Sequence, residues 1–198
     1  MDGHFYALLA RMRYIQRWAL MRNTEPENIQ EHSHMVAILA HALALLQNKH
    51  FGGHIDPGQA ALLALYHDAT EILTGDLPTP IKYYNPALRA SYKEVEETAA
   101  NRLLELLPEE LRGDYAPYLL HPDPELEAVV KAADKLDAYL KCVKERKAGN
   151  GEFQTAQVQI WDALQANPLP ALGYFIQHYL PSFELTLDQL NGSTHTMF

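Results

Sequence analysis

The sequence contains a single cysteine, Cys142, among 198 residues. One cysteine excludes an internal disulfide, which is typical of a protein kept in a reducing compartment. Cys142 lies within an apolar helical pattern, so it is predicted to be a buried structural thiol rather than a nucleophile. The N-terminus lacks a signal-peptide pattern, because an acidic residue follows Met1 and no small-residue cleavage site is present. These features predict a cytoplasmic protein.

Long hydrophobic runs and basic blocks are also missing. No apolar stretch approaches the length needed to cross a bilayer, so no membrane partner is expected. The formal net charge is −9, and no run of lysine or arginine is long enough to follow a phosphate backbone. A nucleic-acid polymer is therefore not expected as a partner. A small anion remains compatible with this charge if a metal or a few cations reverse the field in one cleft.

Alternating strand patterns are nearly absent, and the sequence has no internal repeat and no glycine-rich phosphate loop. Apolar residues instead recur at helical spacing in six segments: 5–12, 29–46, 57–67, 86–107, 124–147 and 155–165. Asp56-Pro57 and Thr79-Pro80 each read as a cap followed by a first-turn proline, the latter starting a short helix. The sequence predicts an all-α fold, a single-domain helical bundle over residues 1–198.

Charged residues interrupt the apolar run in LYHDATEILTGDLPTP, residues 65–80. Burying carboxylates beside a histidine is unfavourable unless they are paired or bind a cation. The adjacent pair His67-Asp68 lies in this run, while His32 and Asp134 each lie on another apolar segment. If helix packing brings these side chains together, they supply mixed nitrogen and oxygen ligands for a divalent metal and leave positions for water and substrate.

Each of these residues has a simpler interpretation when taken alone. A lone histidine on a helix is usually a satisfied core or surface residue, and Asp134 could form a salt bridge with Lys131 or Lys135. Glu71, three residues after Asp68, could be a solvated acid at the end of a helix. An acid at a helix C-terminus opposes the helix dipole, which favours a functional reason for Glu71.

The order His32, His67-Asp68, Asp134 on an all-α chain resembles the HD-domain metal-dependent phosphohydrolase superfamily. Four segments resemble, in the same order, the bacterial HD-domain 5′-deoxynucleotidases: QRWALMRN, ENIQEHSHMVAILAHALA, LYHDATEILTGDLPTPIKYYN and VKAADKLDAYLKC. The similarity spans nearly the whole chain. It implies hydrolysis of deoxyribonucleoside 5′-monophosphates with little base selectivity, and a homodimer.

The resemblance implies one divalent cation, cobalt or manganese first, with magnesium and zinc as alternatives. The implied metal ligands are His32, His67, Asp68 and Asp134. Such an ion would polarise the phosphate and lower the pKa of a bound water. The implied catalytic residues are Glu71, which would orient or deprotonate the attacking water, and Arg17.

The resemblance also implies a set of substrate-binding residues: Arg17, Trp18, Asp68, Asp76, Leu77, Pro78, Thr79 and Asp134. Arg17 would hold phosphate oxygens in a two-pronged arrangement, and Trp18 would cover the sugar. The carboxylate of Asp76 would accept a hydrogen bond from the 3′-hydroxyl, and Thr79 would contact the phosphate from a helix start. The chain departs from the family pattern at Ala19, where a proline is common, and at Thr70, where a serine is common.

Two other functions fit the same pattern. One is an HD phosphohydrolase acting on nucleoside triphosphates, cyclic dinucleotides or guanosine polyphosphates. Two-metal members need additional histidines between the doublet and the last aspartate, and only His121 lies there, which favours one metal. The other is a catalytically silent domain that senses nucleotides. The presence of Glu71 with all four ligands favours hydrolysis, and a phosphate-release assay distinguishes the two.

Overall fold

The computed structural model describes residues 3–78 and 84–192, so the short helix predicted after Thr79 lies outside the described residues. Within these ranges the chain is helical and has no strand, apart from one isolated backbone bridge between Gln16 and Asn28. The all-α prediction is confirmed. The elements, with η marking 3₁₀ turns, are α1 (Phe5–Leu9), η1 (Ala10–Tyr14), α2 (Ile29–His50), α3 (Pro57–Tyr66), α4 (Glu71–Thr74), α6 (Pro86–Glu105), α7 (Glu109–Leu119), α8 (Pro124–Lys147), η2 (Gly151–Phe153), α9 (Gln154–Gln165), α10 (Pro170–His178), η3 (Leu180–Glu184) and α11 (Leu187–Leu190).

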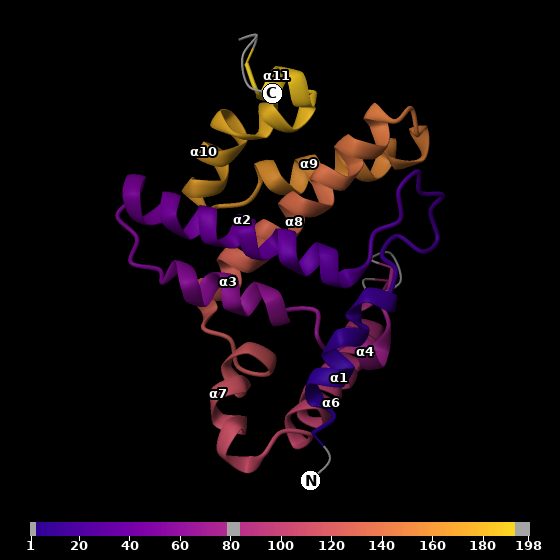
Figure 1. Ribbon diagram of the computed structural model, residues 1–198, viewed down its shortest axis with the longest axis vertical. Helices are drawn as coiled ribbons and strands as arrows, with labels where there is room; N and C mark the ends of the chain where they lie inside the picture. The colour runs from indigo at the N-terminus through magenta and orange to yellow at the C-terminus, as the bar shows by residue number, and fades with distance from the viewer. Residues whose placement is uncertain (1–2, 79–83, 193–198) are drawn as a thin grey trace.

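Helix α2 lies across the middle of the molecule and packs against α3, α8 and α10 (Figure 1). Val36, Leu39 and Leu43 are among the α2 side chains that are buried in the main core, whereas Ile38 and Leu45 on the opposite side are exposed. Leu136 and Leu140 of α8 belong to the same core. This packing is the main favourable contribution to folding, because burial of apolar surface dominates the stability of a domain.

Local capping fixes where the central helices begin. The Asp56 side chain accepts hydrogen bonds from the amides of Gly58 and Gln59 at 2.8 and 3.1 Å, with Pro57 in the first turn of α3. Asn28 accepts similarly from two amides at the start of α2. The predicted starts at Pro57 and Ile29 are therefore confirmed. Because each helix begins at a fixed residue, the same side chains of that helix always face the neighbouring helices.

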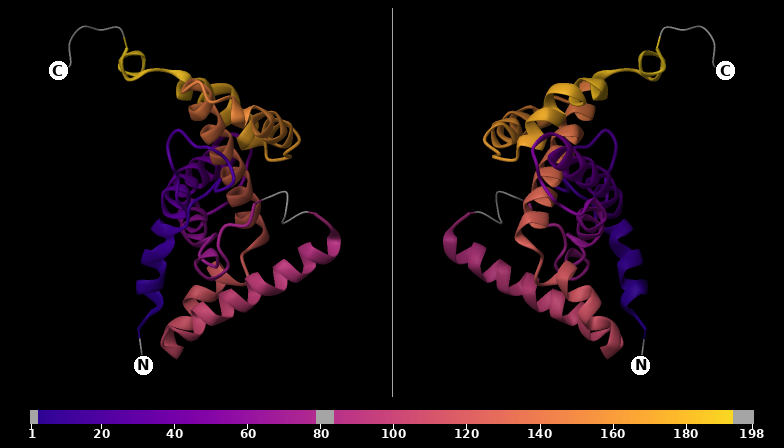
Figure 2. Two further views of the ribbon diagram at one scale, coloured as in Figure 1. Left: turned by 90° about the vertical axis from the view of Figure 1, so that its right-hand side faces the viewer. Right: turned by 90° about the vertical axis from the view of Figure 1, so that its left-hand side faces the viewer.

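A second layer lies below the central helices in Figure 1 and contains α1, α4, α6 and α7. Its core is Phe5, Ala69, Leu103, Leu104 and Leu107, with all of these side chains buried. Figure 2 shows α6 extending away from the rest of the molecule. No helix in the described ranges is long and apolar enough to cross a membrane.

The segment between η1 and α2 is held against α8 by a buried carboxylate. Glu145, which is 1% exposed, accepts hydrogen bonds from the amide and hydroxyl of Thr24 at 2.9 and 2.6 Å and from Asn150 at 2.8 Å. Lys141 forms an ion pair with Glu145 and also donates to the Glu25 carbonyl. Burial raises the pKa of Glu145, but the hydrogen bonds from Lys141 and Thr24 outweigh it and keep the pKa below its ordinary value. The loop is therefore fixed to α8 through one carboxylate.

Replacing Glu145 with alanine is expected to destabilise the protein by about 3–5 kcal/mol, because the buried Lys141 ammonium loses its counter-charge. The thermal midpoint should fall by about 10 °C. Glu152→Ala is a matched control, because Glu152 contacts Arg22 through an exposed ion pair and an exposed hydrogen bond from the Arg22 amide, and such exposed contacts contribute about 1 kcal/mol or less. Urea unfolding of both variants measures the difference, and equal losses would contradict the anchoring role.

Candidate active site

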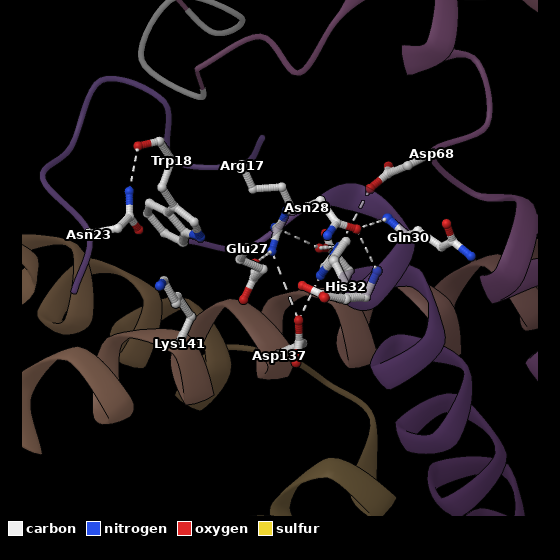
Figure 3. A network of polar contacts seen from close by, with 12 residues as sticks. Arg17, Trp18, Asn23, Glu27, Asn28, Gln30, His32, Asp68, Asp137 and Lys141 are labelled. Atoms are coloured by element: carbon white, nitrogen blue, oxygen red, sulfur yellow. Dashed lines mark hydrogen bonds and ion pairs between the residues drawn. The ribbon is translucent and has the colours of Figure 1, made fainter. Parts of the chain in front are cut away.

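The four predicted metal ligands come together where α2, the turn after α3 and α8 meet. His32 Nε2 lies 3.4 Å from Asp68 Oδ2 and 3.2 Å from Asp134 Oδ1. His67 Nε2 lies 3.2 Å from the same oxygen of Asp68. Figure 3 shows His32 on α2 with the Asp68 carboxylate pointing toward it. Side chains separated by up to about a hundred positions in the sequence thus share one site.

The donor set fits a cation. The Nε2 atoms of His32 and His67 are both buried, and neither has a hydrogen-bond partner among the described residues. A buried polar atom without a partner is rare, and here each one faces carboxylate oxygens. One ligand atom each from His32, His67 and Asp68 lies within 4.8 Å of the others. Asp134 is not in that closest group; it lies beside His32, and its side chain is 38% exposed. Two imidazoles and two carboxylates suit a divalent transition metal.

The electrostatics of this cluster favour ionised carboxylates. Burial raises the pKa of Asp134, but the two histidines and Arg17 outweigh it and hold the pKa well below its ordinary value. Asp68 is shifted in the same direction, chiefly by His67 against the effect of burial. Burial and Arg17 lower the pKa of His32, yet Asp134 and Asp137 raise it to about 9. The cluster therefore holds negative charge that positive charge must balance.

Both histidines are oriented by their second ring nitrogen. His67 Nδ1 lies 2.7 Å from the Ala64 carbonyl, which can only accept, so His67 presents Nε2 to the site. His32 Nδ1 lies 2.6 Å from Asp137 Oδ2. Neither Asp137 nor Glu27 was predicted from the sequence. The available signal was an aspartate one helical turn after Asp134 in an apolar run.

Glu71 lies at the beginning of a helix, so the prediction that it ends one is wrong. It opens the short helix α4, where the dipole favours an acidic side chain rather than opposing it. The dipole argument for a functional Glu71 therefore fails. Its burial supplies a different argument, since the side chain is only 9% exposed and its amide donates to the Asp68 carbonyl at 3.0 Å. Glu71 is held beside the histidine–aspartate pair.

Arg17 brings positive charge to the carboxylates. Its guanidinium pairs with Glu27 and lies 3.9 Å from both Asp134 Oδ1 and Asp137 Oδ2, with the side chain 13% exposed. A backbone hydrogen bond of 2.8 Å from Arg17 to Glu27 closes the segment that carries it. Burial lowers the pKa of Arg17, but Glu27 and the neighbouring aspartates raise it above its ordinary value. Arg17 is thus a fixed cation at the edge of the cluster.

Trp18 has a backbone conformation that is unusual for a bulky residue, with φ of 57°. Its ring packs 5.3 Å from that of Phe153, and the Arg17 guanidinium lies 5.9 Å from its centre. The indole Nε1 is buried and has no acceptor among the described residues. Strained backbone and an unsatisfied buried donor both concentrate at binding sites.

The rest of the predicted substrate loop follows Gly75, which ends α4 with φ of 73°. Asp76, Leu77 and Pro78 are partly buried, whereas Thr79 lies outside the described residues. The simpler interpretation of Asp134 as a partner of Lys131 is not supported, because Lys131 pairs with Glu127 at 2.7 Å.

Solved structures with the same fold include HD-domain phosphohydrolases. That of Listeria innocua has a TM-score of 0.79 and 22% identity, and the match covers 91% of this chain and 88% of that chain. The cyanophage S-2L HD phosphohydrolase DatZ, bound to dA and one catalytic Zn²⁺ ion, has a TM-score of 0.63 at 22% identity, covering 91% and 96%. These neighbours establish the HD-domain fold.

Comparison of sequences identifies the family within this fold to which the chain is similar. The family model described as "5′-deoxynucleotidase YfbR-like" matches residues 4–183. The 5′-deoxynucleotidase VP0926 of Vibrio parahaemolyticus is 52% identical, covering 96% of this chain and 99% of the relative. The 5′-deoxynucleotidase of Shewanella oneidensis is 50% identical, covering 96% and 98%. The chain belongs to the YfbR-like 5′-deoxynucleotidase family.

Proposed function

We propose that the protein is a metal-dependent 5′-deoxynucleotidase that converts deoxyribonucleoside 5′-monophosphates to deoxyribonucleosides and phosphate. Membership of the YfbR-like family and the names of relatives of about 50% identity support this activity. The structural observation that carries it is the pair of buried histidine Nε2 atoms, without hydrogen-bond partners among the described residues, which face Asp68 and Asp134.

Each side chain has a distinct role in the proposed reaction. His32, His67, Asp68 and Asp134 would hold the cation, which when bound would polarise the phosphate and lower the pKa of an adjacent water. Glu71 orients this water and accepts its proton as the oxygen attacks phosphorus. Arg17 keeps the phosphate in line by contacting the oxygens that do not react. The bond from phosphorus to the 5′-oxygen breaks, that oxygen takes up a proton from solvent water to become the deoxyribonucleoside hydroxyl, and Glu71 returns its proton to solvent.

We propose cobalt or manganese as the ion, with magnesium and zinc as alternatives, because mixed imidazole and carboxylate ligands accept several divalent metals. From the resemblance noted in the sequence we further propose a homodimer in the cytoplasm, a single domain over residues 1–198, and contacts from Asp76, Leu77, Pro78 and Thr79 to substrate. The test is phosphate release from a panel of deoxyribonucleoside and ribonucleoside monophosphates with each of the four metals. Light scattering after size exclusion tests the dimer.

The specificity constant for dAMP is expected to exceed that for AMP by roughly tenfold to a hundredfold. Asp76 cannot discriminate through the 3′-hydroxyl, since both sugars carry it. We propose instead that Trp18 and the Asp76 loop enclose C2′, so that an added hydroxyl clashes or is buried without a partner, at about 1–3 kcal/mol. The predicted motifs contain no obvious side chain to form hydrogen bonds with the base, so dAMP, dGMP, dCMP, dTMP and dUMP should all be hydrolysed. A dAMP-to-AMP ratio near one would leave only a general phosphomonoesterase.

A further inference from the structure

Asp137 is one of three acidic side chains that are buried in the described part of the chain, together with Glu71 and Glu145. It lies on α8 and is 6% exposed. Its Oδ2 atom is 2.6 Å from His32 Nδ1 and 3.9 Å from an Arg17 guanidinium nitrogen. Figure 3 shows Asp137 rising from α8 toward both side chains. One carboxylate oxygen of Asp137 therefore contacts His32, a proposed metal ligand, and lies near Arg17, which is proposed to bind the phosphate.

We propose that Asp137 is a positioning residue that fixes His32 in the tautomer able to bind the metal and holds Arg17 beside it. This inference rests on the proposed function, because it assumes that the cluster binds a cation. Asp137 contacts neither the cation nor the substrate in this role. It acts only through the two side chains that do.

A histidine that binds a metal does so as the neutral imidazole, which carries one N–H. A carboxylate accepts only, so the hydrogen bond to Asp137 places the proton of His32 on Nδ1. The lone pair of Nε2 is then left facing Asp68 and Asp134, at 3.4 and 3.2 Å. A carboxylate partner also makes an imidazole a stronger electron donor than a neutral partner does.

His67 provides an internal comparison. Its Nδ1 atom donates to the Ala64 backbone carbonyl at 2.7 Å, so the backbone already fixes its tautomer. His32 has no such carbonyl partner in the described structure, and its Nδ1 contact is the Asp137 side chain. The two histidines reach the same orientation by different means. Only the means used for His32 can be removed by substituting a side chain.

A second cation is the competing interpretation, since ligand atoms of Glu27, His32 and Asp137 also lie within 4.8 Å of one another. The Arg17 guanidinium pairs with Glu27 and lies 3.9 Å from Asp137 Oδ2. The protein therefore supplies positive charge at this position itself, and another cation would be repelled by Arg17. The geometry favours a positioning role for Asp137.

The test measures Co²⁺ binding to the full-length metal-free protein by competition with a chromogenic chelator, together with the visible absorption spectrum of bound Co²⁺. Asp137→Leu keeps the branched shape of the side chain, with methyl groups in place of the oxygens, and removes the acceptor, so the dissociation constant should rise about 10–100-fold. Asp137→Asn keeps a neutral acceptor and should lie between Leu and wild type. Glu145→Gln is the matched control, because it removes a buried acid two turns further along α8 and should lower stability without changing Co²⁺ affinity.

If a folded Asp137→Asn protein had the wild-type Co²⁺ affinity and the wild-type Co²⁺ spectrum, the inference would be overturned and the proposed function would stand. The asparagine variant decides the question if the leucine variant does not fold. Binding of two Co²⁺ ions by wild type and one by Asp137→Asn would also overturn it in favour of the second cation site. A wild-type protein that binds no Co²⁺ would overturn both the inference and the proposed metal-dependent activity. The graded order of wild type, Asn and Leu, with Glu145→Gln unchanged, would support positioning.

Discussion

Replacing Glu71 with glutamine is expected to lower kcat for dAMP by about 10²–10⁴-fold, the usual contribution of a general base. Glu71 is buried at the start of α4, with its amide bonded to the Asp68 carbonyl, so it is held next to the proposed ligands. Its proposed role is to act on water rather than on the ion. Co²⁺ affinity and the Michaelis constant should therefore stay close to wild type.

The control for this variant is Glu109→Gln, an exposed glutamate in the first turn of α7 that should leave turnover unchanged. Steady-state kinetics with saturating cobalt and chelator competition for the apo protein give the two readouts. Parallel losses of metal binding and turnover would instead identify Glu71 as a ligand.

Replacing Asp134 with alanine should abolish hydrolysis at a slight excess of metal and weaken metal binding. Asp134 Oδ1 lies 3.2 Å from His32 Nε2 and 3.9 Å from Arg17, so the substitution removes negative charge at the point where the proposed cation and the phosphate clamp meet. Turnover is measured as cobalt is raised from equimolar to large excess.

Glu127→Ala is the matched control for Asp134→Ala, because Glu127 lies two helical turns earlier on α8 and, within residues 3–78 and 84–192, its side chain forms an ion pair only with the exposed Lys131. Its activity should equal that of wild type. Full activity of Asp134→Ala at a slight excess of metal would show that Asp134 is structural.

The helices with strong local signals could be predicted from the sequence. Asp56-Pro57 and the long apolar run from Ile29 give accurate starts for α3 and α2, because capping depends on adjacent residues. Helix α7 was not predicted. It has no fully buried side chain, and Gly113 and Pro117 interrupt it, so neither periodicity nor propensity identifies it.

The residues of the candidate site also differ in how far the sequence predicts them. The adjacent His67-Asp68 pair is visible as a motif, whereas His32 and Asp134 are marked only as polar residues on apolar segments, and it is the resemblance that favours them as ligands. Asp137 and Glu27 contact His32 and Arg17 only because α8 crosses α2 and the preceding loop folds back, and no local pattern encodes this crossing. Glu71 was placed at the wrong end of a helix because α3 stops at Tyr66, and a turn separates it from α4.

The left-handed backbone at Trp18 carries an energetic cost. A bulky residue in this region is less stable than glycine would be by roughly 1–2 kcal/mol. The conformation persists because neighbouring contacts impose it, including hydrogen bonds to the Trp18 carbonyl from the Met21 amide at 2.9 Å and from the Asn23 side chain at 3.2 Å. Glycine would relieve this strain, but it would also remove the packing of the indole against Phe153 and Arg17, which for a large aromatic side chain is the greater contribution to stability. A glycine variant would have a mobile backbone where the indole stood, and it should lose thermal stability together with discrimination between sugars.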